Sequence, residues 1–317
     1  MTRQFLAVLI CFTTGAAMAI TPEDIEAASF EGQGLPDGQS PLSVKVQVLL
    51  DRADISPGVI DGYKGGMVES ALRAFERREG LEIDGDIDAE VWRRLKGDTA
   101  AGITGTHRIS AKDLEHVTGI LPTDYAQLAE RDRLGYERPS EALAELFHMD
   151  EDFLILLNPD ARFAEGDEIA VVRPKADASG EVARILVHRE TGRLEALSKD
   201  GSILGNYPVA VGSQETPSPS GKMEVNAVAP EPTYTYNPDL NFQQGDNDEV
   251  LILPPGANGP VGLVWIDLSK PTYGIHGTPD PARLFVEQSH GCVRMTNWDV
   301  QELAGMVGPG VSVEFVE

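Results

Sequence analysis

Apolar side chains between Pro41 and Lys96 recur at helical spacing in three stripes. Turn sequences separate the stripes, Ser56-Pro57-Gly58 with Asp61-Gly62 before the second and Asp84-Gly85 before the third. The stripes contain Val44, Gln47, Val48 and Leu50 or Asp51; Val68, Ala71, Leu72 and Phe75; and Ala89, Val91, Trp92 and Leu95. The pattern predicts three small helices around one core over residues 41–97. Residues 20–40 show no apolar period and are expected to form a linker.

Residues 104–175 combine helical and strand patterns. Glu141 to Leu157 has helical spacing in two pieces, divided at His148-Met149-Asp150 and ended by Asn158-Pro159. The turn Glu165-Gly166-Asp167 precedes a short strand expected at 168–172. These elements predict a small α/β module or a helical spacer.

From Val182 onward the chain breaks into short alternating or β-branched segments, which predict strands. The segments lie at 183–187, 193–197, 207–211, 261–268 and 311–316. Residues 180–317 are therefore expected to form a mostly β domain with a helix that starts near Asn297. The stretch from Pro230 to Pro260 is rich in Pro, Gly, Asn and Asp and is expected to be a lid, with Tyr234, Tyr236 and Phe242 available for packing. A disordered loop is the alternative.

The first 19 residues predict an export signal. Arg3 gives a positive start, residues 5–12 an apolar stretch, and Ala17-Met18-Ala19 a small-x-small cleavage site. A retained membrane anchor is the alternative, but the stretch is shorter than the roughly 20 residues that span a bilayer. The mature chain is expected to begin after Ala19 and to contain no membrane span.

Charge and cysteine content exclude several classes of function. Lys and Arg number 26 against 51 Asp and Glu, a formal net charge of −25. A nucleic-acid partner is excluded because binding it requires a basic face. Cys11 leaves with the signal, so the mature chain carries the single thiol Cys292. One Cys and scattered His offer no cluster with metal spacing, so neither a metal nor another cofactor is expected.

Two short segments carry candidate chemistry. Cys292 lies in Ser289-His290-Gly291-Cys292-Val293-Arg294-Met295, shortly before the predicted helix, where backbone N–H groups favour a thiolate. His276, 16 residues earlier in Tyr273-Gly274-Ile275-His276-Gly277-Thr278, is the candidate base. The carbonyl of Gly277 is a candidate to orient the second ring nitrogen. The N–H groups of Gly291 and Cys292 are expected to form an oxyanion hole.

This pair of motifs resembles the signature of the L,D-transpeptidase catalytic domain of the YkuD type, over most of residues 182–317. Thr216-Pro217-Ser218-Pro219-Ser220-Gly221 is similar to that family's Thr-Pro-x-Gly turn. The resemblance implies that Cys292 is the nucleophile, His276 the base, Gly277 the orienting carbonyl and Arg294 part of the substrate site. Ser289, His290 and Gly291 belong to the same motif. His290 is open to two roles, a substrate contact or a substitute base.

The resemblance implies acyl transfer on peptidoglycan. The Cys292 thiolate attacks the bond after the L-centre of meso-diaminopimelate in a tetrapeptide stem, and D-alanine leaves. An amine on another stem or on an outer-membrane lipoprotein then accepts the acyl group. The alternatives are an L,D-carboxypeptidase or amide hydrolase with the same Cys/His site, and a wall-binding structural protein without activity.

Residues 41–97 resemble a peptidoglycan-binding domain, through residues 46–50, 58–62, 69–76 and the turns Gly80-Leu81 and Asp84-Gly85. Leu156-Leu157-Asn158-Pro159 and Gly166-Asp167-Glu168-Ile169 are similar to the second half of a LysM carbohydrate-binding module; an unrelated spacer is the alternative. The expected fold class is thus multidomain α+β: three small helices, a LysM-like module or spacer over 104–175, and a mostly β catalytic domain. The expected partners are the stem peptides and glycan of the wall.

Overall fold

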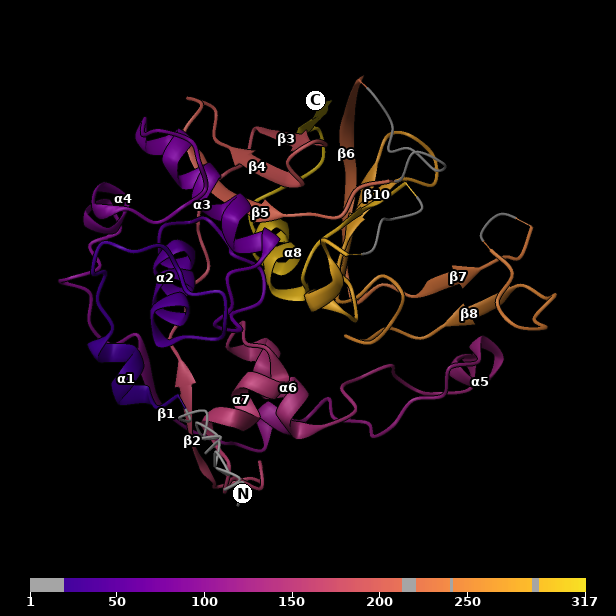
Figure 1. The fold of residues 1–317 in the computed structure, drawn as a ribbon. Coiled ribbons are helices and arrows are strands. Elements are labelled where there is room, and N and C mark those ends of the chain that lie inside the picture. The colour runs from indigo at the N-terminus through magenta and orange to yellow at the C-terminus, as the bar shows by residue number, and fades with distance from the viewer. Residues whose placement is uncertain (1–19, 213–220, 240–241, 287–290) are drawn as a thin grey trace, which may run out of the picture.

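The computed structural model describes residues 20–212, 221–239, 242–286 and 291–317, and Figure 1 shows the fold. Three expected features lie outside these residues: the export signal at 1–19, all of the 216–221 motif except Gly221, and the motif residues Ser289 and His290. No helix among the described residues is long and apolar enough to cross a membrane.

Three helices form over 41–97, as expected: α2 (Pro41–Arg52), α3 (Gly66–Glu79) and α4 (Ala89–Arg94). Local sequence explains their ends. The Ser40 hydroxyl accepts from the Ser43 N–H at the start of α2, and Asp88 caps α4 in the same way. Gly80 ends α3 in the left-handed conformation, with φ of 70°.

The segment expected as a linker instead packs into the protein. Residues 20–40 contain helix α1 (Pro22–Ala27), which starts with a capping box between Thr21 and Asp24. Ile25, its buried residue, is fully enclosed, and Leu35 is also buried. The Lys45 ammonium donates to the carbonyls of Glu26 and Ala28, which fixes α1 against α2.

The middle module has strand–helix–helix–strand order. β1 (Thr104–Arg108) pairs antiparallel with β2 (Glu168–Val172), and α6 (Pro139–Leu146) and α7 (Glu151–Leu157) lie between them in the chain. The Asn158 side chain joins the end of α7 to β2 through bonds with Leu154 and Ala170. β1 was not expected from the sequence. One hydrophobic core runs from Ile25 to Val172, so the N-terminal helices and the middle module share it.

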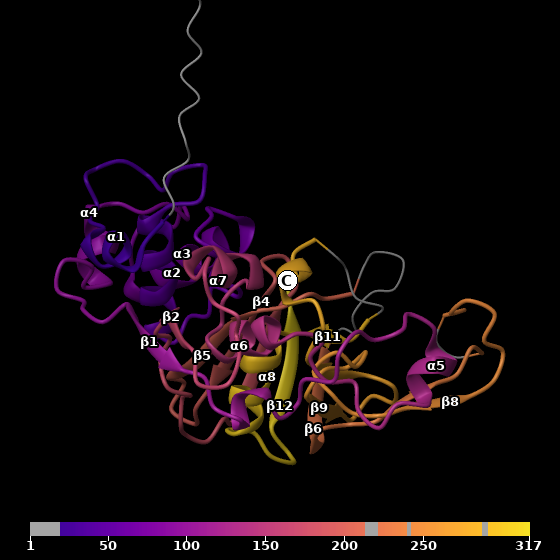
Figure 2. The same cartoon turned by 90° about the horizontal axis from the view of Figure 1, so that it is seen from below.

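An insertion between β1 and α6 contains η1 (Lys112–Leu114) and α5 (Tyr125–Ala129). We call residues 118–134 the arm. The Pro230–Pro260 stretch is a hairpin of β7 (Tyr234–Tyr236) and β8 (Leu251–Leu253), and Figures 1 and 2 show α5 beside it. The rings of Tyr234, Tyr236 and Phe242 all contact Tyr125 of the arm, with centroids 5.2–6.4 Å apart. The aromatic residues of this stretch therefore pack as expected, and they pack on the arm.

The C-terminal domain is a curled sheet of eight strands in the order β11-β10-β9-β6-β12-β3-β4-β5. The strands are β3 (Arg184–His188), β4 (Arg193–Leu197), β5 (Ile203–Pro208), β6 (Gly221–Pro230), β9 (Val264–Leu268), β10 (Gly274–His276), β11 (Val293–Arg294) and β12 (Ser312–Val316). The strand expected at 207–211 is found at 203–208 instead, because the residues after Pro208 no longer pair with β4. Ala210 bridges Arg294 of β11 instead, so the two ends of the sheet meet.

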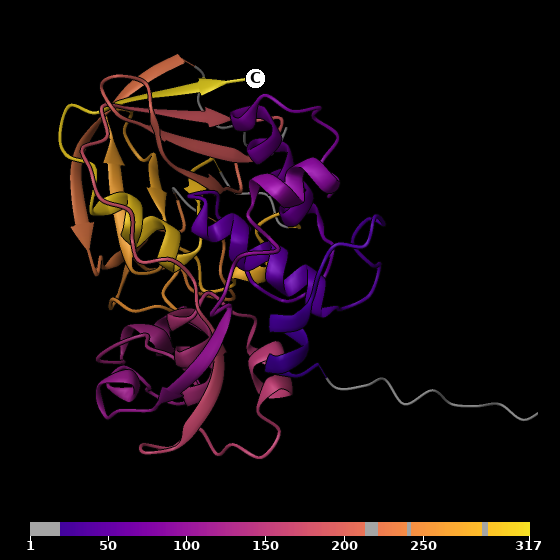
Figure 3. The same cartoon turned by 90° about the vertical axis from the view of Figure 1, so that its left-hand side faces the viewer.

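The helix expected near Asn297 is α8 (Asn297–Ala304), capped by Thr296. Short 3-10 helix η2 (Pro281–Arg283) precedes the cysteine motif. Figure 3 shows the sheet beside the N-terminal helices, with the β1–β2 module below both. The apolar side of α8 packs in the core of the sheet, and its polar residues face the two N-terminal units.

Candidate active site

His276 and the cysteine motif lie on adjacent parallel strands. β10 pairs with β11 in the register His276↔Arg294, and the Met295 N–H donates to the His276 carbonyl at 2.8 Å. Cys292 directly precedes β11 and is two residues from Arg294. The paired residues His276 and Arg294 share one face of the sheet, and Cys292 lies in the bend that leads into β11. The pairing brings together three of the residues expected from the sequence.

The His276 ring is buried and held in one tautomer. Its Nδ1 lies 2.7 Å from the Gly277 carbonyl oxygen, which can only accept, so Nδ1 carries the proton and Nε2 keeps its lone pair. The Trp265 ring stacks on the imidazole with centroids 5.5 Å apart. Burial lowers the pKa of His276 to about 4; the Gly277 bond opposes the shift and the Arg294 charge adds to it. At neutral pH the ring is uncharged and able to accept a proton.

The Cys292 thiol is partly buried, and its Sγ lies 3.6 Å from the Thr272 carbonyl oxygen. Burial raises the pKa of Cys292, and a backbone hydrogen bond from Gly274 lowers it by less. The expectation that the helix start favours the thiolate is not met: β11 and the Thr296 cap separate the thiol from α8, and the helix effect falls off within one turn. The resting pair is therefore a thiol and a neutral imidazole.

Two glycines are required by their surroundings. Gly291 has φ of 120°, a conformation that side-chain-bearing residues rarely adopt, and a Cβ there would lie 3.0 Å from the Tyr273 ring. Gly277 has no room for a side chain, because a Cβ would lie 2.2 Å from Asn297 Oδ1. The oxyanion hole of Gly291 and Cys292 N–H groups remains a prediction.

Tyr234 of the expected lid is connected to this site, and so are two residues to which sequence patterns gave no role there. Burial is the main cause that raises the pKa of Tyr234 in β7 to about 12, and electrostatic contributions from Tyr125 and Cys292 add to it. Asn297 and, from the middle module, Glu145 lie behind the Gly277 turn. Their signals are single polar residues in unremarkable helical contexts, which only the tertiary structure connects to the site.

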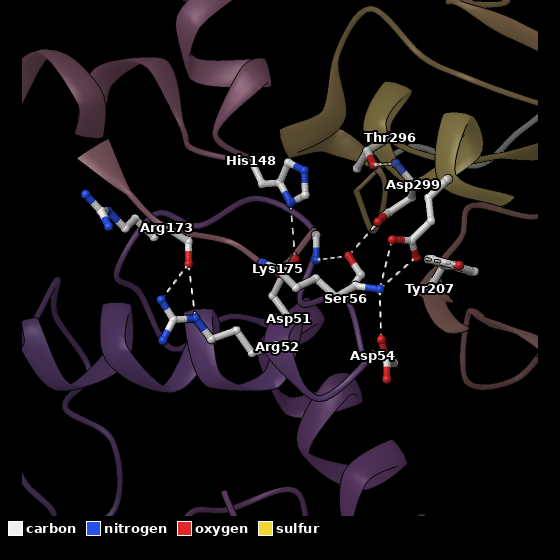
Figure 4. Close-up of polar contacts among 12 residues, drawn as sticks. Asp51, Arg52, Asp54, Ser56, His148, Arg173, Lys175, Tyr207, Thr296 and Asp299 are labelled. Atoms are coloured by element: carbon white, nitrogen blue, oxygen red, sulfur yellow. Dashed lines mark hydrogen bonds and ion pairs between the residues drawn. The ribbon is translucent and has the colours of Figure 1, made fainter. Parts of the chain in front are cut away.

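Helix α8 is tied to the N-terminal units by buried polar contacts, shown in Figure 4. Ser56 donates to Asp299 at 2.9 Å, and the Lys175 ammonium bridges Asp54 and Glu302. His148 forms a hydrogen bond with Asp51 at 3.1 Å and stacks on Trp298 of the helix. The Tyr207 hydroxyl donates to Glu302 at 2.7 Å. The helix after the cysteine motif thus depends on three parts of the chain.

No group of three or more His, Cys, Asp or Glu side chains in the described ranges is arranged to hold a metal ion. The residues near the thiol are those of acyl chemistry: a thiol, a neutral imidazole, a guanidinium and backbone amides.

Comparisons with known proteins identify the class. The L,D-transpeptidase catalytic domain matches residues 182–315, and a peptidoglycan-binding domain matches residues 39–95. YqjB of Bacillus subtilis, named as an L,D-transpeptidase, is 31% identical over 134 residues, 41% of this chain and 68% of that protein. YkuD of the same organism, also so named, is 38% identical over 117 residues, 37% of this chain and 56% of YkuD. The chain thus spans little more than half the length of YkuD.

Solved structures similar to the chain include L,D-transpeptidase 3 from Mycobacterium tuberculosis with a faropenem-derived adduct, at 17% identity and a TM-score of 0.36, covering 48% of this chain and 75% of that one. The matches to the catalytic domain and to YqjB show that the chain belongs to the L,D-transpeptidase family. Within it, this protein joins the catalytic domain to an N-terminal peptidoglycan-binding domain, so these two resemblances are confirmed, whereas the LysM-like one stays a prediction.

Proposed function

We propose that the protein is a peptidoglycan L,D-transpeptidase with Cys292 as nucleophile and His276 as base. The observation that carries the proposal is the pairing of β10 with β11, which sets the cysteine motif beside a neutral imidazole whose Nδ1 proton is held by Gly277. Membership of the L,D-transpeptidase family supports the same assignment.

The reaction follows from the protonation states. Nε2 of His276 takes the thiol proton as Sγ of Cys292 attacks the carbonyl at the L-centre of meso-diaminopimelate in a tetrapeptide stem. The C–N bond breaks, the proton passes to the departing amine of D-alanine, and a thioester remains. An acceptor amine then attacks the thioester and gives a proton to His276, the C–S bond breaks, and the proton passes from His276 to Sγ, which restores the thiol and the neutral imidazole.

Arg294 and the hairpin supply recognition in this proposal. The Arg294 guanidinium shares a face with His276 and can bind a stem carboxylate through two N–H groups. The β7–β8 hairpin, which carries Tyr234, acts as a lid over the stem in the same proposal. Ser289, His290 and Gly291, from the same motif, are assigned oxyanion or substrate roles.

The N-terminal units deliver the enzyme in the same proposal. The signal over residues 1–19 exports the chain, the mature protein is periplasmic and associated with the wall, and the peptidoglycan-binding domain holds it there. The LysM-like middle module contributes a glycan contact. The acceptor amine belongs to a second stem, which gives a 3→3 crosslink, or to an outer-membrane lipoprotein.

Purified disaccharide tetrapeptides incubated with the mature protein test the proposal. A dimer with loss of D-alanine, identified by mass, indicates transpeptidation, whereas the disaccharide tripeptide alone indicates an L,D-carboxypeptidase that uses water. Cys292→Ala serves as the control for both. Unchanged tetrapeptide with a folded wild-type protein would refute the proposal, and an added lipoprotein that gains no stem would exclude that acceptor.

A further inference from the structure

A carboxyl group from the middle module contacts the first residue of α8. Asn297 is almost fully buried, and its Nδ2 donates to both Glu145 oxygens, at 3.3 and 3.1 Å, and to the Ala257 carbonyl at 3.2 Å. The Tyr136 hydroxyl donates to Glu145 Oε2 at 3.2 Å. Glu145 thus holds the amide from one side while a neighbouring tyrosine holds Glu145. Both groups come from a unit that carries none of the proposed catalytic residues.

The other end of the Asn297 amide lies against the turn that follows His276. Asn297 Oδ1 accepts from the Leu263 N–H at 3.1 Å, and a Cβ on Gly277 would lie only 2.2 Å from it. The Gly277 N–H donates to the Val264 carbonyl at 3.3 Å. The amide therefore packs against Gly277 and is bonded to the residue before Val264, whose carbonyl accepts from the Gly277 N–H.

We infer that Glu145 is a positioning residue for the active-site histidine, acting through Asn297 and the Gly277 turn. Without an acceptor at position 145, the Asn297 amide loses both bonds to Glu145 and keeps only the Ala257 carbonyl and the Leu263 N–H, so it is held less firmly against the Gly277 turn. The Gly277 carbonyl then ceases to favour the Nδ1–H tautomer. Any His276 that shifts the proton to Nε2 presents no lone pair to the thiol.

Replacement of Glu145 by glutamine is the conservative control for the variants that remove the acceptor. Burial raises the pKa of Glu145 to about 8, although the bonds from Asn297 and Tyr136 oppose the shift, so the side chain is mostly the neutral acid at pH 7. Glu145→Gln keeps an acceptor oxygen of the same reach. Glu145→Ala removes the acceptor, and Glu145→Met removes it while filling the same space, which guards against a variant that fails through a cavity.

The inference rests on the proposed function only in taking His276 as the base. The experiment therefore measures two quantities on the mature protein: the ¹⁵N chemical shifts of the His276 ring, which report the tautomer without any substrate, and the rate at which a carbapenem acylates Cys292, followed by mass. Melting curves confirm that each variant is folded. Ser56→Ala is the control, because it removes a bond from the N-terminal domain to Asp299 on the same helix but leaves Asn297 untouched.

We expect Glu145→Ala and Glu145→Met to show a mixture of ring tautomers and acylation slower by about 10- to 100-fold, the range that misplacement of a catalytic group produces. Glu145→Gln and Ser56→Ala should keep the wild-type tautomer and rate. A folded Glu145→Met with the wild-type tautomer overturns the inference, as does an equal change in Ser56→Ala. A wild-type protein that keeps the Nδ1–H tautomer but does not react with the carbapenem counts against the proposed function instead.

Discussion

The low pKa of His276 predicts that cysteine acylation continues well into the acid range. The perturbation is acidification from pH 7 to pH 4 with a carbapenem as acyl donor. With a pKa of about 4, about 90% of His276 is neutral at pH 5, whereas about 3% of an ordinary histidine, with pKa about 6.5, would be neutral there. The rate at pH 5 should thus be near its plateau, about 30-fold above that expected for an unperturbed base.

The assay is the second-order rate of Cys292 acylation, measured by mass at half-unit steps of pH, with near-ultraviolet circular dichroism to confirm the fold at each step. Arg294→Gln is the matched variant, because the Arg294 charge helps to lower the pKa of His276. In this variant the fall in acylation rate at low pH, the acid limb of the pH–rate profile, should move toward higher pH. An acid limb of the folded wild type near pH 6.5, or strong thiolate absorbance at neutral pH, would refute the neutral thiol–imidazole pair.

Three further predictions follow from the same structure. Cys292→Ala should abolish acylation with an unchanged melting temperature, since the partly buried thiol contributes little packing; acylation at another residue would contradict the assignment. Tyr125→Ala should slow acylation and admit protease cleavage in the β7–β8 hairpin, while Tyr125→Phe keeps the ring contacts and should behave as wild type in both assays. Burial raises the pKa of Asp299 to about 7, so the stability contributed by its protonated form is complete below about pH 4 and is lost as pH rises through 7. Between pH 5 and pH 8, the melting temperature of Asp299→Asn should therefore fall less than that of the wild type.

Sequence patterns predict the elements whose signal is local. The stripes of α2 and α3, the strand β4 and the two-piece helix ended by Asn158 all form where the pattern places them. α1 has one buried apolar residue in six and offers no periodicity to detect. β1 reads Thr-Gly-Thr-His-Arg and becomes a strand because β2 supplies its partner. Such elements form through contacts with residues far along the chain, so a local stretch of sequence does not predict them.

The same division applies to the candidate site. Cys292, His276 and Gly277 are identifiable because two short motifs carry them, and the structure pairs those motifs. Glu145 is 147 residues before Cys292 on a helix of another unit, and its relation to His276 passes through Asn297 and a peptide turn. A reader of sequence sees an acidic residue in an amphipathic helix, because burial and the partner amide that give it a role arise only on folding.

The core shared by the N-terminal helices and the middle module has a consequence for how the enzyme samples the wall. Domains joined by flexible linkers would sample many relative positions, with an effective concentration set by linker length. Here the peptidoglycan-binding domain and the middle module share one apolar core, and buried bonds such as Ser56 to Asp299 join them to α8. A glycan strand held by the N-terminal domain would therefore lie at a constant distance and angle from Cys292. This fixed geometry would select stem peptides by their spacing along a glycan strand and between neighbouring strands.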